Sequence, residues 1–269
     1  PVPLMKLAKV GGGDVLMRNT VALGSTLALT DYGIDLLEGV IRDQFGRKGD
    51  EVVKKNMILA QSGYDFVKNN YPQGYQVKLS AKKDSSKTTD ANIKVDKQLV
   101  LTGNEALGLG AIAAGMKFFA AYPMTPINGL LYYLAGVAEQ VGFVYKQPED
   151  EIAGINMAIG ASFAGVRAMV ATSGGGFSLM VEGTSLAGMI EQPVVIILGQ
   201  RPGPATGLPT WTTQSDLHFA LNAGQGEFPR LMLAPGDAEE AFYLTTVAFN
   251  LADKYQTPTF VLVDKFLSE

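Results

Sequence analysis

The chain has 269 residues, of which 47% are hydrophobic and 18% are charged, and its formal net charge at pH 7 is -4. This apolar content is too high for a disordered chain, and the slightly acidic balance leaves no electrostatic footprint for nucleic acid. Cysteine is absent, which excludes disulfides, thiolate catalysis and any iron–sulfur cluster held by this chain alone.

The longest apolar runs are too short to cross a membrane. Residues 153–164 and 193–198 are interrupted or ended by Gly, Asn, Ser or charged residues, well before the roughly 20 apolar residues that a spanning helix needs. No basic start is followed by an apolar signal core, and the first residue is Pro1. We therefore expect a soluble, cytoplasmic protein without membrane contact, and a chain that is a fragment or a processed product.

The first 79 residues predict helices. Between residues 34 and 45, apolar residues recur every three or four positions, as they do on amphipathic helices. The following stretch, SAKKDSSKTTDANIKVDK at residues 80–97, is rich in Ser, Thr, Lys and Asp and is typical of a linker. These patterns predict a smaller, mainly helical N-terminal segment at 1–79, a linker at 80–99, and a second domain at 100–269.

In the second domain, predicted helices alternate with short apolar strands. Helices are predicted over 104–115, 126–140, 149–164, 177–191 and 238–255, and strands over 118–122, 143–145, 167–171, 194–198, 231–233 and 259–263. This alternation implies right-handed crossovers and a mostly parallel sheet with helices on both faces. We therefore expect a doubly wound α/β domain.

Ligands of such sheets bind at the carboxyl ends of the strands. The segments that follow the predicted strands are YPMTP, KQPEDE, TSGGGF, GQRPGP and APGD. They contain most of the unusual residues of the chain, and the topology assigns them to one edge of the sheet. We therefore expect a single site there.

Thr125 and Glu151 are the first two candidates. Thr125 stands where a helix N-cap is expected, with Pro126 at the first helical position, and a capping hydroxyl would still have a proton free for a ligand. Glu151 follows two other acids at a predicted helix start, where the helix dipole stabilises negative charge. It also adjoins the expected core stripe of Ile152 and Ile155, where a carboxyl tends to be protonated or hydrogen-bonded.

The other candidates lie after later strands. The glycines of TSGGGF suit either an anion cradled on backbone N–H groups or close packing of the backbone. Arg201 begins a rigid, proline-rich loop and offers either a fork for a carboxylate or a surface charge. His218 is expected in the core or at an interface rather than in catalysis, and Trp211 is expected to be a packing anchor.

Three separated stretches carry a family resemblance: AAYPMTPINGLLYYLA, QPEDEIAGINMAIGASFAGVRAMVATSGGGFSLMVEG and GQRPGPATGLPT. Residues 100–269 closely resemble the pyrimidine-binding domain of the 2-oxoacid:ferredoxin oxidoreductase alpha subunit, a thiamine-diphosphate enzyme. The preceding segment, with NTVALGSTLALT, resembles the end of the gamma domain that some members carry ahead of alpha. Met124 and Ile127 depart from the family's usual Ile and Ser at these positions.

The resemblance implies roles for individual residues. Glu151 would hydrogen-bond the aminopyrimidine ring of thiamine diphosphate and favour its imino tautomer, while Tyr122 and Pro123 would also contact the cofactor. Thr125 would contact the cofactor and the 2-oxoacid, and Arg201 would pair with the substrate carboxylate. No metal ligand is expected in this chain.

The resemblance also implies partners. A beta subunit would bind the diphosphate and its magnesium, and the iron–sulfur clusters would also lie outside this chain. The acyl group would pass to coenzyme A and the electrons to ferredoxin. Two alternatives remain open at this point: a non-catalytic nucleotide- or ligand-binding α/β module that uses TSGGGF, and an assembly scaffold, which the presence of Thr125, Glu151 and Arg201 together disfavours.

Overall fold

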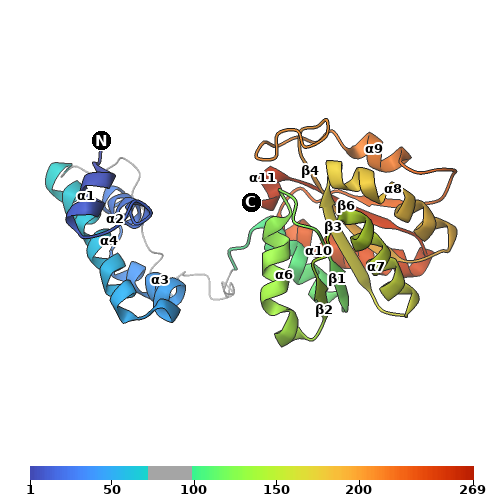
Figure 1. Ribbon diagram of the computed structural model, residues 1–269, viewed down its shortest axis with the longest axis horizontal. Helices are drawn as coiled ribbons and strands as arrows, with labels where there is room; N and C mark the ends of the chain where they lie inside the picture. The colour runs from blue at the N-terminus through green and yellow to red at the C-terminus, as the bar shows by residue number, and fades with distance from the viewer. Residues whose placement is uncertain (72–98) are drawn as a thin grey trace, which may run out of the picture. The chain divides into compact units, whose positions relative to one another are not determined.

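The computed structural model describes residues 1–71 and 99–269. The chain divides into two compact units, within residues 1–97 and 98–269 (Figure 1), and each unit is described by itself. The predicted linker at 80–99 lies outside the described residues except for Leu99.

The first unit is helical, as expected. Its elements are α1 (Leu4–Val10), α2 (Arg18–Leu29), α3 (Asp35–Phe45), the 3-10 helix η1 (Gly46–Lys48) and α4 (Asp50–Asn70). Helices α2 and α4 pack closely because Gly24 and Gly63 lie where a side chain would collide with the backbone of the opposite helix. Residues at helical spacing on each element, such as Val21 and Leu59, form small apolar cores.

The second unit alternates helices and strands. In chain order the elements are α5 (Gly103–Ala113), β1 (Phe118–Ala120), α6 (Asn128–Val141), β2 (Val144–Lys146), α7 (Glu151–Phe163), β3 (Ala168–Ser173), α8 (Gly174–Met189), β4 (Val194–Gln200), α9 (Leu217–Asn222), β5 (Leu231–Leu233), α10 (Ala238–Tyr255), β6 (Thr259–Asp264) and α11 (Lys265–Ser268). The six strands form one sheet in the order β2-β1-β3-β4-β6-β5, and every neighbouring pair is parallel. The predicted α/β fold is confirmed.

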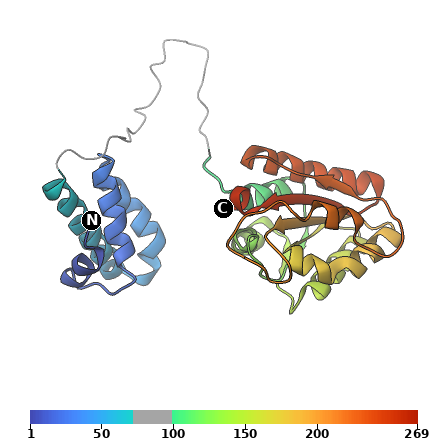
Figure 2. The same cartoon turned by 90° about the horizontal axis from the view of Figure 1, so that it is seen from above.

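Helices cover both faces of this sheet, which Figure 2 shows nearly edge-on. Side chains of α5, α6 and α10 pack on one face around Phe119, and side chains of α7, α8 and α9 pack on the other around Phe177. Every residue of the central strands β3 and β4 is buried. Such burial is expected for the central strands of a parallel sheet that helices cover on both faces. Both strands accordingly begin with apolar runs, AMVA in β3 and VVIIL in β4.

Four of the five predicted helix starts differ from the structure: α5 begins one residue earlier than predicted and α7 two residues later, and the starts of α6 and α8 have identifiable local causes. Helix α6 begins at Asn128 rather than at residue 126, because the chain first makes a turn in which the Ile127 N–H bonds to the Met124 carbonyl at 3.0 Å. Helix α8 begins at Gly174 rather than at residue 177, so the three glycines form its first turn. Glycine has a low helix propensity, and the local pattern therefore favoured a loop there.

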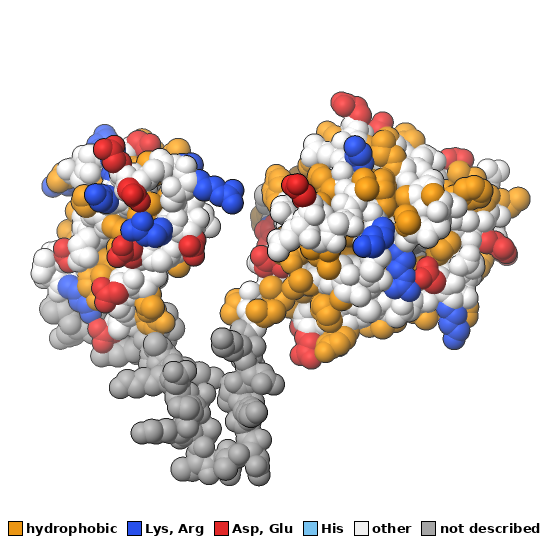
Figure 3. Space-filling view, turned by 90° about the horizontal axis from the view of Figure 1, so that it is seen from below, with side chains coloured by type: hydrophobic (Ala, Val, Ile, Leu, Met, Phe, Trp, Pro, Cys, Tyr) orange, Lys and Arg blue, Asp and Glu red, His pale blue; other side chains and the backbone are white. Residues whose placement is uncertain are grey.

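The larger unit exposes many apolar side chains. Phe163 and Met189, near the ends of α7 and α8, are 76% and 82% exposed. Figure 3 shows apolar side chains gathered over one face of this unit, with charged side chains scattered between them. Extensive apolar surface favours contact with a partner. Among the described residues, no helix combines the length and apolar character needed to cross a bilayer.

Candidate active site

The candidate residues meet at the carboxyl ends of β1, β3 and β4, which are neighbours in the sheet. Within the described residues, seven buried side-chain polar atoms lack a hydrogen-bond partner. Six of the seven belong to residues of this edge: Asn104, Asn128, Glu151, Ser173, Arg201 and Asp216. Because buried polar atoms in folded proteins are nearly always paired, this concentration indicates a place prepared for a ligand.

Glu151 is the first residue of α7 and is only 3% exposed. The N-cap of this helix is Asp150, whose carboxylate accepts the Ala153 N–H at 2.8 Å. Ile152, expected in the core, is 50% exposed, because the buried stripe of α7 runs instead through Glu151, Ile155 and Ile159. Glu151 is therefore part of the core-facing side of the helix, and its Oε1 has no hydrogen-bond partner in the part of the chain that the structure describes.

Burial raises the pKa of the Glu151 carboxyl above the ordinary value of 4.5. The negative charge of Asp150 acts in the same direction, while the backbone N–H of Glu151 and the positive charge of Arg201 oppose the rise. Low polarity penalises the charged form of a carboxyl. The neutral form of Glu151 is therefore favoured more than that of an exposed glutamate.

The glycines of TSGGGF make room for carboxyl groups. A Cβ at Gly176 would lie 2.5 Å from Glu151 Oε1 and closer still to Thr172 Oγ1. A Cβ at Gly174 would lie 2.6 Å from Asp216 Oδ2. The close-packing alternative therefore explains these glycines, and two carboxyl groups beside the helix start disfavour a bound phosphate there.

Thr125 is not a helix cap, contrary to the expectation. The N-cap position of α6 is Ile127, and no side chain caps this helix. The Thr125 hydroxyl oxygen instead accepts a hydrogen bond from Asn128 Nδ2 at 3.4 Å, and Asn104 Nδ2 donates to the Pro126 carbonyl at 3.0 Å. The Thr125 hydroxyl proton remains free to be donated.

Arg201 follows β4 and is only 7% exposed, which excludes the surface-charge alternative. Its Nη1 donates to the carbonyl oxygen of Thr125 at 2.9 Å, while its Nε has no hydrogen-bond partner within residues 1–71 and 99–269. Burial lowers the pKa of the guanidinium, and the negative charges of Glu151 and Asp216 raise it. The structure thus brings Thr125, Glu151 and Arg201 together around one positive charge.

The remaining predicted residues are distributed differently. Tyr122 and Pro123 follow β1 at the same edge, with Tyr122 38% exposed. His218 is exposed, with its Nδ1 3.2 Å from Asn222 Nδ2, so its placement in the core is wrong. Trp211 is 65% exposed and therefore anchors no packing within this chain. Both residues belong to the segment between β4 and β5, where Trp211 lies in a loop and His218 lies in the short helix α9, and both side chains are exposed.

Sequence reasoning missed Asp216, the residue before α9. Burial raises the pKa of this carboxyl, against the opposing effects of the Arg201 backbone N–H and charge. Asp216 also lines a pocket of about 320 Å³ at the start of α8, together with Arg201, Ser178 and Phe219. No local sequence pattern identifies Asp216 as a site residue. Its one distinguishing feature in the sequence is its position as an acid near the end of a proline-rich loop at the expected ligand edge.

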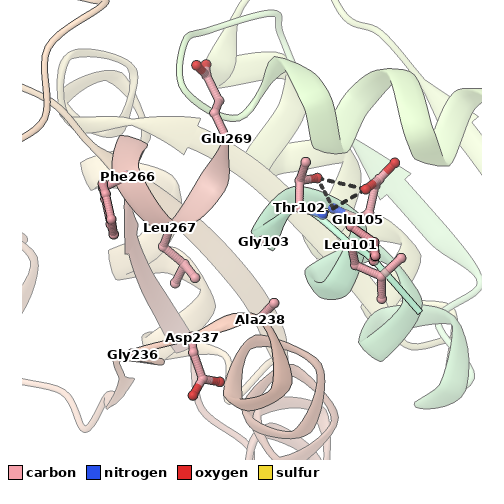
Figure 4. Close-up of a pocket in the computed structure, with 11 residues that line it drawn as sticks. Leu101, Thr102, Gly103, Glu105, Gly236, Asp237, Ala238, Phe266, Leu267 and Glu269 are labelled. Atoms are coloured by element: carbon pink, nitrogen blue, oxygen red, sulfur yellow. Dashed lines mark hydrogen bonds between the residues drawn. The ribbon is translucent and has the colours of Figure 1, made fainter. Parts of the chain in front are cut away.

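A larger cavity, of about 640 Å³, lies farther along the sheet at the carboxyl ends of β5 and β6 (Figure 4). Its wall includes Gly236 and Asp237 of the APGD segment, and Thr102 and Glu105, which hold each other's backbone N–H groups at the start of α5. None of its lining residues has an unpaired buried side-chain polar atom. The APGD segment therefore does not join the other four at the candidate site.

Comparison with known proteins identifies the family of the chain. The model of the thiamine-diphosphate-binding domain of pyruvate flavodoxin/ferredoxin oxidoreductases matches residues 109–269, more than half of the chain. The chain belongs to this oxidoreductase family. A second model of the family, pyruvate ferredoxin/flavodoxin oxidoreductase, matches residues 1–66. Both compact units thus have counterparts in this family.

Individual relatives are named as subunits of such enzymes. The chain is 41% identical over 264 residues to subunit alpha of 2-oxoacid:ferredoxin oxidoreductase 1 from Sulfurisphaera tokodaii, covering 94% of this chain and 39% of the relative. It is 46% identical over 168 residues to the 2-oxoglutarate synthase subunit KorA from Archaeoglobus fulgidus, covering 62% and 49%. The chain thus spans less than half of the length of these relatives, whose names imply multi-subunit complexes.

A solved structure is also similar. It is the 2-oxoglutarate:ferredoxin oxidoreductase from Magnetococcus marinus with 2-oxoglutarate, coenzyme A and succinyl-CoA bound, at 36% identity and a TM-score of 0.82, covering 100% of this chain and 45% of that one.

The buried, unpaired Oε1 of Glu151 fits a hydrogen bond with an aminopyrimidine. Within the described residues, no three His, Asp or Glu side chains are grouped as metal ligands.

Proposed function

We propose that this chain is part of the alpha subunit of a 2-oxoacid:ferredoxin oxidoreductase and forms the pyrimidine-facing half of its thiamine-diphosphate site. The observation that carries the proposal is the arrangement of a buried, unpaired Glu151 carboxyl and a buried Arg201 at the ligand edge of the sheet. By the same proposal, residues 1–79 end a gamma-type domain, residues 80–99 link it, and residues 100–269 bind the pyrimidine.

The chemistry is divided between the cofactor and the chain. Thiamine diphosphate, when bound, supplies the electron sink for decarboxylation of a 2-oxoacid. Glu151 holds a proton at its carboxyl and hydrogen-bonds the pyrimidine ring, because burial favours its neutral form. Tyr122 and Pro123, which follow β1 at the same edge, would also contact the cofactor.

The substrate contacts follow from the remaining polar groups. Arg201 binds the 2-oxoacid carboxylate, since a guanidinium fork matches that group and the Nε of Arg201 has no partner among the described residues. The Thr125 hydroxyl donates a hydrogen bond to the substrate, because its oxygen already accepts a hydrogen bond from the Asn128 side chain. Both residues hold the substrate in one orientation at the reacting carbon.

The other components belong to partners. A beta subunit binds the diphosphate and its magnesium and covers the exposed apolar side chains of the larger unit. Because the chain has no cysteine, iron–sulfur clusters of the complex are held elsewhere and deliver electrons to ferredoxin. Coenzyme A accepts the acyl group. The glycines of TSGGGF offer no support for a nucleotide-binding module, since they face two carboxyl groups.

The test is oxoacid-dependent reduction of a ferredoxin surrogate by the assembled complex, with and without thiamine diphosphate and coenzyme A. Pyruvate, 2-oxoglutarate and a branched-chain oxoacid are compared in parallel. We expect reduction that requires both the cofactor and coenzyme A, with one oxoacid preferred. A fully assembled, cofactor-loaded complex that reduces nothing would overturn the proposal.

A further inference from the structure

Asn104 is a buried polar residue in the first turn of α5, and its side chain is only 2% exposed. Its Nδ2 donates to the carbonyl oxygen of Pro126 at 3.0 Å, across 22 positions of the chain. The Oδ1 of the same amide has no hydrogen-bond partner among the described residues. Burying an amide is unfavourable unless it is hydrogen-bonded, so the bond to Pro126 is the contact that accounts for an asparagine at this position.

The Pro126 carbonyl belongs to the turn between β1 and α6, in which the Ile127 N–H bonds to the Met124 carbonyl at 3.0 Å. Pro126 and Ile127 are both buried. A Cβ at Gly199 of β4 would lie 2.6 Å from Ile127 Cγ2 and 3.0 Å from Pro126 Cγ. The turn therefore packs directly on the backbone of β4, where only glycine leaves room for it.

Two successive carbonyl groups of this turn accept hydrogen bonds from buried side chains of other elements. The Thr125 carbonyl accepts from Arg201 Nη1 at 2.9 Å, and the Pro126 carbonyl accepts from Asn104. Gly129 belongs to the same arrangement, because a Cβ there would lie 2.7 Å from Asn104 Nδ2. Since each peptide unit is planar, holding these two carbonyl groups fixes the orientation of the backbone that carries the Thr125 side chain.

We propose that Asn104 is a positioning residue that directs the Thr125 hydroxyl toward the 2-oxoacid by holding the Pro126 carbonyl. This inference rests on the proposed function, in which that hydroxyl contacts the substrate. A group oriented before the substrate arrives loses less freedom on binding, and a small displacement of a contacting group lowers the rate strongly. Arg201 holds only the first of the two carbonyl groups. Without Asn104, the peptide unit after Pro126 would be free to turn, and the Thr125 side chain would move with it.

The first test is Asn104→Leu, which keeps the branched shape of the side chain and removes the donor. In the assembled, cofactor-loaded complex, we expect kcat/KM for the preferred oxoacid to fall about tenfold. Asn70→Leu is the matched control, at an exposed asparagine of α4 whose Nδ2 donates to the Phe66 carbonyl at 2.7 Å, and it should change kcat/KM by no more than about twofold.

Gly129→Ala is a second variant, and it keeps the amide of Asn104 but displaces it. Because alanine is also the better helix former, this variant tests the inference even where Asn104→Leu fails to assemble. We expect kcat/KM to fall in the same direction. An unchanged kcat/KM in both Asn104→Leu and Gly129→Ala would overturn the inference.

A double variant with Thr125→Val separates positioning from direct contact with the substrate. Valine has no hydroxyl, so adding Asn104→Leu should then change kcat/KM by no more than about twofold, because two residues that act through one contact are not additive. If Asn104 instead touched the substrate itself, or acted only through general stability, the full loss would persist in the Thr125→Val background. That outcome would overturn the inference.

Amide hydrogen exchange of the assembled complex without oxoacid provides a readout that does not depend on activity. Asn104→Leu should speed exchange in residues 124–131 by about fivefold or more and leave β6 unchanged, because only the turn loses a contact. Unchanged exchange in this turn would overturn the inference and leave the proposed function intact. A native complex without oxoacid-dependent activity would instead overturn the proposed function, and with it the substrate role of the turn.

Discussion

Nη1 of Arg201 donates a hydrogen bond of 2.9 Å to the carbonyl oxygen of Thr125, and 76 residues of chain separate the two. Arg201 follows β4 and Thr125 follows β1, the two strands that flank β3 in the sheet. The bond spans the end of β3 and fixes the two substrate-contacting candidates relative to each other. Several consequences of this arrangement are measurable in the assembled complex.

Replacing Arg201 by Lys should raise the KM for the oxoacid roughly 10- to 100-fold. Lysine keeps the charge but loses both the bond to Thr125 and the planar fork, and a hydrogen bond to a charged group contributes ~1.5–3 kcal/mol. Steady-state kinetics of the complex measures this change. Arg167→Lys is the control, because Arg167 also donates to a backbone carbonyl, that of Ala114, but at the opposite edge of the sheet. An equal KM increase in both variants would contradict the assignment.

Replacing Glu151 by Gln should lower turnover by roughly 10²- to 10⁴-fold, the usual loss when a positioned acid–base group is removed. The amide keeps the shape of the side chain but cannot transfer a proton. Turnover of the cofactor-loaded complex is the measurement, with Glu149→Gln as the control at an exposed acid two residues earlier. Near-native turnover of Glu151→Gln would remove Glu151 from the mechanism.

The same substitution should change the pH dependence of stability. Because the pKa of Glu151 is raised in the folded state, the native fold binds its proton more tightly than the unfolded chain does, and stability is lost as the pH rises from 4.5 through the folded-state pKa. Glu151→Gln should therefore have the higher free energy of unfolding at pH 7, with the advantage shrinking toward pH 4. Denaturant unfolding of the 269-residue chain at several pH values tests this, and a pH-independent difference would count against it.

Replacing Gly176 by Ala should displace the Glu151 carboxyl, because the added methyl carbon would lie 2.5 Å from its Oε1. We expect a loss of thiamine-diphosphate affinity of at least tenfold, measured by titration of the assembled complex with the cofactor. Gly136→Ala on α6 is the control, since nothing lies within 4 Å of its added carbon. That variant should be more stable by ~0.5–1 kcal/mol, the usual advantage of Ala over Gly within a helix.

Replacing Asn104 by Ala should lower the free energy of unfolding by ~1–3 kcal/mol, because the buried carbonyl of Pro126 would lose its donor. Asn156→Ala is the matched control. Its side chain also donates to a backbone carbonyl, that of Ile152, but it is exposed and the contact is local, so a change within about 0.5 kcal/mol is expected. An equal loss of unfolding free energy in both variants would show that the bond from Asn104 to the Pro126 carbonyl contributes no more to stability than the exposed bond of Asn156.

The alternation of helices and strands was predictable because each element is a local pattern. Strands β3 and β4 begin with the apolar runs AMVA and VVIIL, and helix α10 has the predicted bounds, with the Asp237 carboxylate accepting the Glu240 N–H at its start. A parallel sheet with ligands at its carboxyl edge follows from that alternation. The same logic placed Thr125, Glu151 and Arg201 together before any contact between them was known.

The sequence by itself therefore determined the fold class and the edge of the sheet where the candidate residues lie, since both depend on local periodicity and on which residues follow each strand. Only the tertiary structure decided which polar groups meet: Arg201 donates to the Thr125 carbonyl, and Asn104 donates to the Pro126 carbonyl. It also decided that the Asp216 carboxyl lies beside Gly174, where a side chain would collide with it. These pairs join residues far apart in the chain. Their partners are set by strand order and loop closure, which no spacing within the sequence encodes.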